Sequence, residues 1–117
     1  MIKTINLNAW GSNHPISFHL ANYADNNNLY VGMITHDEEM PEPWSDLTVN
    51  LGYSLPMGTA FIDTNNNPGI LDWLEANNLG KRSGRKAQSG FCTYEIFYFN
   101  MEELMQYVSH DSREEEE

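Results

Sequence analysis

Cysteine is almost absent from this chain of 117 residues. Its one cysteine, Cys92, cannot form a disulfide within the chain, which argues against a small secreted scaffold held together by disulfides. Long apolar runs are also lacking, because no stretch approaches the roughly 18 apolar residues that a membrane-spanning helix needs. Residues 1–8 contain no apolar segment typical of a signal peptide. We therefore expect a cytoplasmic protein without a membrane partner.

Positive charge is scarce as well. Six Lys and Arg stand against 17 Asp and Glu, so the formal net charge is −11. Such a surplus favours solubility and repels nucleic acids and anionic membranes. Four of the six basic residues are nevertheless concentrated in residues 80–90, a segment rich in Gly and Ser: Lys81, Arg82, Arg85 and Lys86. We expect a flexible, exposed loop that binds a partner or an anion, unless these charges pair with the protein's own acids or remain solvated.

The chain has enough apolar material for a folded core. Hydrophobic residues make up 40% of it, including three Trp, six Tyr and five Phe. A chain of this length can bury roughly two-thirds of its unfolded surface. We expect one domain over residues 1–108, followed by an acidic, flexible tail over residues 109–117, which ends in four consecutive Glu.

Alternating apolar and polar positions predict strands over residues 16–21, 29–35, 44–51, 60–63 and 91–99. The first two flank Asp25 and three Asn residues, which favour a tight turn, and so predict a hairpin. Apolar groups on both faces of residues 91–99 indicate a central strand. Two prolines make residues 36–43 a predicted loop.

Two helices are expected. Asn67 as N-cap and Pro68 at the first helical position begin one helix, and Gly80 stands where a C-terminal glycine would end it. Asn100 caps a second helix, with Glu103 three residues later completing a capping box. The pattern predicts an α+β fold: a mostly antiparallel sheet of about five strands with two helices packed on it.

Chemical motifs are weak. The segment beginning at Asp63, Thr64 and Asn65 resembles the first half of a calcium-binding loop, but Pro68 replaces the glycine that such a loop needs. A turn and a helix cap, using Asp63, Asn65 and Asn67, explain it better. We expect no catalytic residue, metal or cofactor. Exposed aromatic residues could form an interaction patch, although core packing is the default expectation for Trp10, Tyr30, Trp44 and Tyr53.

Three segments carry a family resemblance: residues 46–51, residues 60–68, and residues 79–94 with their Gln-Ser-Gly-Phe-Cys-Thr-Tyr sequence. They resemble an uncharacterised family of small proteins, a domain of unknown function, encoded in bacterial plasmids, conjugative transposons and phages, especially of Firmicutes. The resemblance covers residues 16–104 and implies a bacterial accessory protein of a mobile genetic element. It implies no catalytic residue.

A looser similarity concerns residues 22–24 and 28–32, which are reminiscent of the opening segment of anti-restriction proteins from the same kinds of element. Those proteins are acidic mimics of DNA. Three hypotheses follow. The first is a non-enzymatic binding or regulatory module, whose partner is a protein, with a nucleic-acid contact through the basic loop as the alternative. The second is a DNA mimic that inhibits a host defence enzyme. The third is a small enzyme whose pocket gathers Asp63 with a histidine or Cys92.

Overall fold

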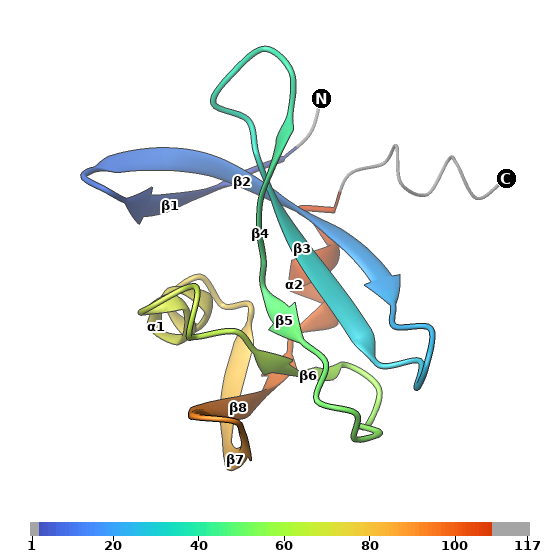
Figure 1. Cartoon of the computed structure of the whole chain (residues 1–117). Helices are drawn as coiled ribbons and strands as arrows, with labels where there is room; N and C mark the ends of the chain where they lie inside the picture. Colours follow the sequence, from blue (N-terminus) through green and yellow to red (C-terminus); the bar gives the residue numbers. More distant parts are fainter. Residues whose placement is uncertain (1–2, 109–117) are drawn as a thin grey trace, which may run out of the picture.

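The computed structural model describes residues 3–108, and strands dominate them (Figure 1). Eight strands form two antiparallel sheets of four, in the orders β1-β2-β3-β4 and β5-β6-β8-β7. The first sheet contains β1 (Ile5–Ala9), β2 (Ser12–Asn22), β3 (Leu29–Thr35) and β4 (Glu42–Asp46). The second contains β5 (Thr48–Val49), β6 (Thr59–Ile62), β7 (Gly80–Ser89) and β8 (Cys92–Phe99). The helices are α1 (Ile70–Ala76) and α2 (Met101–Met105). The predicted tail lies outside the described residues.

The predicted hairpin of the first sheet is confirmed. β2 pairs with β3, and Phe18 stands opposite Met33. Alternate side chains of the two strands point into the core, where Phe18 and Val31 are fully buried. The predicted loop of residues 36–43 reaches only Pro41, since β4 already begins at Glu42. β1 was not predicted; it pairs with β2 through a two-residue turn and forms one edge of the sheet.

The prediction of one sheet of about five strands is wrong, and Leu47 explains why. Residues 44–51 were expected to form one strand, but the chain changes sheets at this fully buried residue. The Leu47 N–H donates to the Val31 carbonyl of the first sheet at 2.9 Å. Its own carbonyl accepts from the Asp63 N–H, just after β6 of the second sheet, also at 2.9 Å. The predicted strand of residues 44–51 is therefore divided between β4 in one sheet and β5 in the other.

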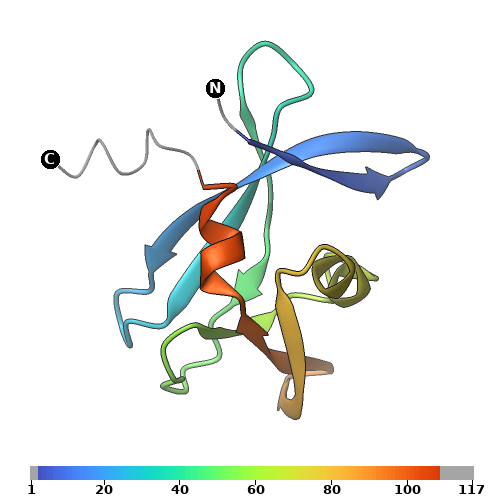
Figure 2. The same ribbon diagram turned by 180° about the vertical axis from the view of Figure 1, so that it is seen from behind.

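Both helices contribute to a core that the two sheets share. Ile70, Leu71 and Leu74 of α1 and Leu104 of α2 are buried in one cluster with residues of both sheets. After α2 the chain returns to β2, where the Phe18 N–H donates to the Tyr107 carbonyl at 2.8 Å. Figure 2 shows α2 lying against β2 and β3. No helix within residues 3–108 is long and apolar enough to cross a membrane.

The N-terminus of α1 differs from its prediction. The helix begins at Ile70, and its N-cap is Gly69 in the left-handed conformation, with φ of 79°. Asn67 is not the cap, because its buried side chain is used elsewhere: its Nδ2 donates to the carbonyls of Asp46 and Asp63, at 3.0 Å each. The predicted turn over residues 63–67 is present, with the Asn67 N–H donating to the Asp63 carbonyl at 3.2 Å.

Gly80 is not the glycine that ends α1. The helix ends at Ala76, with Asn77 as its C-cap, and Gly80 is the first residue of β7. Its φ is 148°, and a Cβ placed there would lie 2.0 Å from the Tyr98 carbonyl oxygen. Only glycine fits where β7 approaches β8 this closely. The predicted helix-ending role of Gly80 is therefore wrong, and strand packing is the reason for glycine at this position.

The cap of α2 is confirmed in one of its two halves. The Asn100 side chain accepts from the Glu103 N–H at 3.3 Å. The Glu103 carboxylate does not return to Asn100; it accepts from Gln106 and Tyr107 instead. The Asn100 N–H is already bonded to the Leu79 carbonyl at 2.8 Å, so the reciprocal half of the capping box has no free donor.

Candidate functional site

The basic segment is a strand, not a flexible loop. Residues 80–89 form β7, which pairs with β8 along nearly its whole length. β8 lies between β6 and β7, which confirms the predicted central strand. The β7–β8 hairpin forms one end of the molecule, and the loop between β3 and β4 forms the opposite end in both views (Figures 1 and 2). The four basic residues are all exposed on this end.

The cations occupy both faces of the hairpin. Residues directly opposite each other on paired strands share a face. Lys81 stands opposite Tyr98, while Arg82 stands opposite Phe97 and Lys86 opposite Glu95. Lys81 therefore shares its face with Tyr98, and Arg82 and Lys86 lie on the other face. A flat partner surface could contact only one of these faces at a time.

Arg82 holds the hairpin to α1. Its guanidinium donates to Asp72, and its Nε to Glu75 at 3.3 Å. Its backbone N–H donates to the same Glu75 carboxylate at 3.0 Å. The alternative that the basic residues pair with the protein's own acids is therefore realised for this residue. Among residues 3–108, no carboxylate forms an ion pair with the other three: Lys81, Arg85 and Lys86.

A bulge in β7 displaces Arg85 from the ladder. Between Arg82 and Lys86 three residues of β7 stand against one residue of β8. Gly84 takes φ of 79° there, and its N–H donates to the buried Glu95 carboxylate at 2.9 Å. The Arg85 N–H donates to the Ser83 hydroxyl at 2.9 Å. The bulge is thus fixed by hydrogen bonds to these two side chains, and it leaves Arg85 without a partner residue on β8.

Exposed aromatic rings accompany these cations. Phe91 lies in the two-residue turn between β7 and β8 and is fully exposed, and Tyr98 is 45% exposed. The half-buried Tyr94 lies on the same face of β8 as Tyr98, because every second side chain of a strand points to the same side. The sequence pattern predicts all three rings on one central strand over residues 91–99, whereas Phe91 precedes β8. Gly90, which has φ of 62°, is the one local signal for this turn, since glycine is favoured in two-residue hairpin turns.

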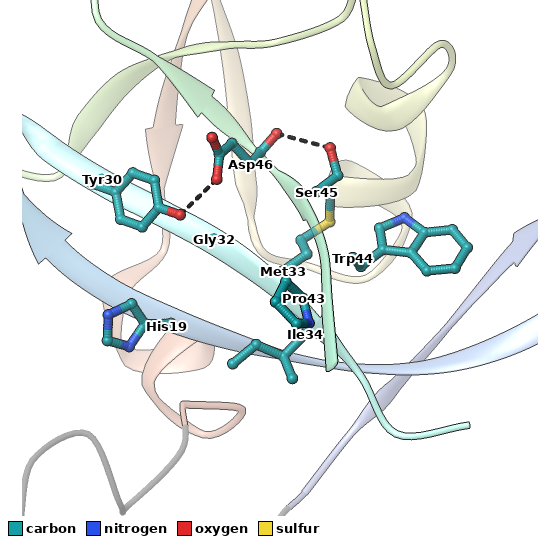
Figure 3. Close-up of a pocket in the computed structure, with 9 residues that line it drawn as sticks. All are labelled: His19, Tyr30, Gly32, Met33, Ile34, Pro43, Trp44, Ser45 and Asp46. Carbon is teal, nitrogen blue, oxygen red and sulfur yellow. Dashed lines mark hydrogen bonds between the residues drawn. The ribbon is translucent and has the colours of Figure 1, made fainter. Parts of the chain in front are cut away.

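A second feature is a shallow pocket of about 430 Å³ on the outer surface of β2, β3 and β4 (Figure 3). The Tyr30 ring crosses Gly32, where an added Cβ would lie 2.5 Å from the Tyr30 hydroxyl. That hydroxyl donates to Asp46 at 2.6 Å. Burial and the Asp46 carboxylate raise the pKa of Tyr30 to about 12. The phenol therefore keeps its proton at neutral pH, and this arrangement fastens β3 to β4.

The carboxylate of Asp63 has a structural role. It accepts from the backbone N–H of Asn66 at 3.1 Å and from the Asn66 Nδ2 at 2.8 Å. These bonds close the turn that leads into α1. Asn65, by contrast, is exposed and makes no side-chain hydrogen bond within the described chain. Within residues 3–108, no three His, Cys, Asp or Glu side chains are grouped so that they could hold a metal ion.

Comparison with known proteins gives one match. Residues 17–116 match a family described as a domain of unknown function (DUF4313). No curated protein matches the chain significantly. No solved structure does either. Because the match spans most of the sequence, including both sheets and both helices apart from β1 and the start of β2, the chain belongs to the DUF4313 family.

Proposed function

We propose that this protein is a non-enzymatic accessory protein of a bacterial mobile genetic element, and that it binds an acidic segment of a partner protein through the β7–β8 hairpin. One observation carries the proposal: Lys81, Arg85 and Lys86 have no ion-pair partner within residues 3–108, and they lie on the hairpin that exposes Phe91 and Tyr98. The mobile-element origin rests on the sequence resemblance alone.

The two kinds of side chain have different tasks. Aromatic residues supply most of the affinity of a typical interface, because they bury a large apolar area in few rotatable bonds. Charges at the rim mainly accelerate association and select the sign of the partner. Most of the affinity for the partner therefore comes from the face that carries Lys81, Tyr94 and Tyr98, together with Phe91 at the tip. Arg85 and Lys86 attract the acidic partner.

A protein partner fits better than a nucleic acid. A long polyanion would extend beyond the hairpin and meet a molecule with a net charge of −11. At physiological ionic strength charges act over only about 8 Å, so the hairpin's field dominates only near its own surface. A short acidic segment on a protein can bind within that range without approaching the remaining carboxylates.

The test is site-specific photocrosslinking in a bacterial host. A benzophenone amino acid replaces Phe91, and in a matched control it replaces Tyr53, which is 57% exposed in the loop between β5 and β6. We expect a protein adduct at position 91 and not at 53, lost when Lys81, Arg85 and Lys86 are changed to Glu without a change in melting temperature. An adduct that survives this charge reversal, or one that contains nucleic acid, would refute the proposal.

Mimicry of DNA remains an alternative prediction. It requires carboxylates spaced like phosphates along one face, whereas the β7–β8 hairpin at one end of the molecule carries four of the six basic residues. A restriction digest performed with excess protein distinguishes the two. Protection of the DNA, unchanged by the charge reversal of the hairpin, would favour the mimic.

A further inference from the structure

A groove lies between the first sheet and the segment that leads into α1, on a part of the molecule separate from the hairpin. Its volume is about 550 Å³. It is enclosed by β1, by the turn after β1, by β4 and by residues 66–70. Its principal lining residues are Leu7, Asn8, Trp10, Trp44, Asn66 and Pro68. We call it the Trp groove.

Two tryptophans form an aromatic platform in the Trp groove. The Trp10 and Trp44 ring centroids are 5.3 Å apart. Trp10 occupies the two-residue turn between β1 and β2 with φ of 52°, a conformation that bulky residues rarely adopt, and it is 89% exposed. Trp44 is the extra residue of a bulge, because Met33 pairs with Ser45 and Ile34 pairs with Pro43. The expectation that Trp10 packs in the core is therefore wrong, because this large ring covers little apolar surface of its own protein.

An open strand edge borders the same groove. Asn6 stands opposite Pro15, which has no N–H, so this pair cannot exchange ladder hydrogen bonds. The Asn6 carbonyl indeed points away from β2 and accepts from the Trp73 indole N–H at 2.7 Å. Because paired residues alternate, the N–H and carbonyl of Asn8 also point away from β2. Within residues 3–108 these two backbone groups of Asn8 have no hydrogen-bond partner.

The lining residues of the groove are uncharged, but the chain segments that supply them are acidic. No Lys or Arg occurs between Lys3 and Lys81, and every residue that lines the groove comes from that stretch. The loop that precedes β4, together with β4 itself, carries five carboxylates: Asp37, Glu38, Glu39, Glu42 and Asp46. One of them, Asp37, accepts from His14 at 2.6 Å, and the His14 ring lies tilted against Trp44, with ring centroids 4.6 Å apart. The site thus combines π faces, a free strand edge and an adjoining acidic segment.

We propose that the Trp groove binds an extended, positively charged peptide segment of another protein. A Lys or Arg side chain of that segment lies on the indole faces, where the ring quadrupole attracts a cation. Its main chain hydrogen-bonds to the free N–H and carbonyl of Asn8, as in strand addition. A second copy of this protein is a poorer occupant, because each copy carries a net charge of −11 and the two repel.

The experiment measures binding of nonapeptide pools in which the central residue is fixed as Arg, Lys, Leu or Glu and the flanking residues are randomised. We expect the Arg and Lys pools to bind at least tenfold more tightly than the Glu pool at low salt. The Trp10→Ala variant should lose this binding by tenfold or more, and Tyr53→Ala, which removes another exposed ring, should leave it unchanged. Because Trp10 is 89% exposed, its removal should leave the melting temperature unaltered.

Two further measurements sharpen the result. N-methylation of the best peptide at alternate residues should weaken binding at one set of positions only, as main-chain pairing with Asn8 requires. Sedimentation of the free protein should show a monomer. Equal binding of the Arg and Glu pools, an undiminished affinity in Trp10→Ala, or a dimer that Trp10→Ala dissociates would each overturn the proposal. At physiological ionic strength, where charges act over only about 8 Å, charge reversal of the β7–β8 hairpin should not affect peptide binding, so this inference and the proposed function fail independently.

Discussion

Asn67 shows how a polar side chain can be buried for its hydrogen bonds. It is only 8% exposed, and its Nδ2 donates to the carbonyls of Asp46 and Asp63, both at 3.0 Å. These two carbonyls belong to the end of β4 and to the turn after β6, so the side chain joins the two sheets. A buried carbonyl that loses its donor costs far more than an exposed one, because no water replaces the bond.

We therefore predict that Asn67→Ala lowers the free energy of unfolding by about 1–3 kcal/mol, since two buried hydrogen bonds are lost and each carbonyl keeps only its other donor. Asn65→Ala is the matched control. Asn65 is exposed and makes no side-chain hydrogen bond within residues 3–108, so its replacement should change stability by less than about 0.5 kcal/mol. Urea denaturation of both variants is the measurement. Equal losses would mean that Asn67 does not join the sheets energetically.

Sequence patterns identified the importance of this asparagine but not its task. An Asn before a Pro predicts a helix cap from local preferences alone. The two carbonyls that Asn67 actually binds include one that lies 21 residues away, at Asp46. A local pattern contains no information on a contact made across two sheets. The exposure of Trp10 escaped prediction for the same reason, because composition favours burial of Trp and only the turn geometry exposes it.

Strand β7 is the element that the sequence pattern predicted least well. Its ten residues read as a loop, with Gly, Ser, Lys and Arg in most positions. The strand forms because β8 offers a complete partner edge, and because a bulge at Ser83–Arg85 absorbs the residues that do not fit the ladder. The prediction of a flexible finger was therefore wrong about the backbone. The exposure of its basic residues was as expected.

Gly80 makes the packing of β7 against β8 testable. We predict that Gly80→Ala destabilises the protein by about 3 kcal/mol or more, because the new Cβ would lie 2.0 Å from a backbone oxygen that cannot move without breaking the ladder. Gly84→Ala, in the bulge, also has positive φ but has open space around it, so it should cost only about 1 kcal/mol. Chemical denaturation compares them. A smaller loss for Gly80→Ala than for Gly84→Ala would contradict this packing.

Local patterns predicted those elements whose partners lie nearby in sequence. The β2–β3 hairpin depends on the short turn that joins its strands, and the Asn100 cap depends on a residue three positions later. Both are confirmed. Division into two sheets depends on Leu47, which bonds to Val31 and to Asp63. Residues 44–51 look like one continuous strand because the alternation of apolar side chains does not record which sheet each half joins. The sequence composition identified the basic residues of β7 as candidate binding residues. Their distribution over the two faces of the hairpin follows only from the pairing of β7 with β8.

Charge is distributed unevenly over the protein. The acidic loop between β3 and β4 and the cationic β7–β8 hairpin lie at opposite ends in both views (Figures 1 and 2). The described residues measure about 39 Å along their longest axis. At 0.01 M salt charges act over about 30 Å, so nearly every carboxylate senses every other one. Because acids outnumber bases almost threefold, repulsion dominates this sum, and it is stronger in the compact state than in the expanded unfolded chain.

Salt should therefore stabilise the fold. We predict that the free energy of unfolding rises by about 1 kcal/mol between 0.01 and 0.5 M sodium chloride, as screening removes the repulsion. The ion pairs of Arg82 with Asp72 and Glu75 oppose this trend, but exposed pairs contribute only about 0–1 kcal/mol, and they are few. Urea denaturation at several salt concentrations gives the slope of stability against ionic strength.

Two variants of opposite sign decide whether net charge is the cause. Glu39→Gln removes one negative charge from the exposed β3–β4 loop, and the slope should become shallower. Lys86→Gln removes one positive charge from the hairpin without breaking an ion pair in the described chain, and the slope should become steeper. If local pairing rather than overall repulsion controlled stability, salt would destabilise the protein and both variants would leave the slope unchanged. The sign of the salt effect thus shows whether overall charge repulsion or individual ion pairs control the free energy of unfolding of this acidic protein.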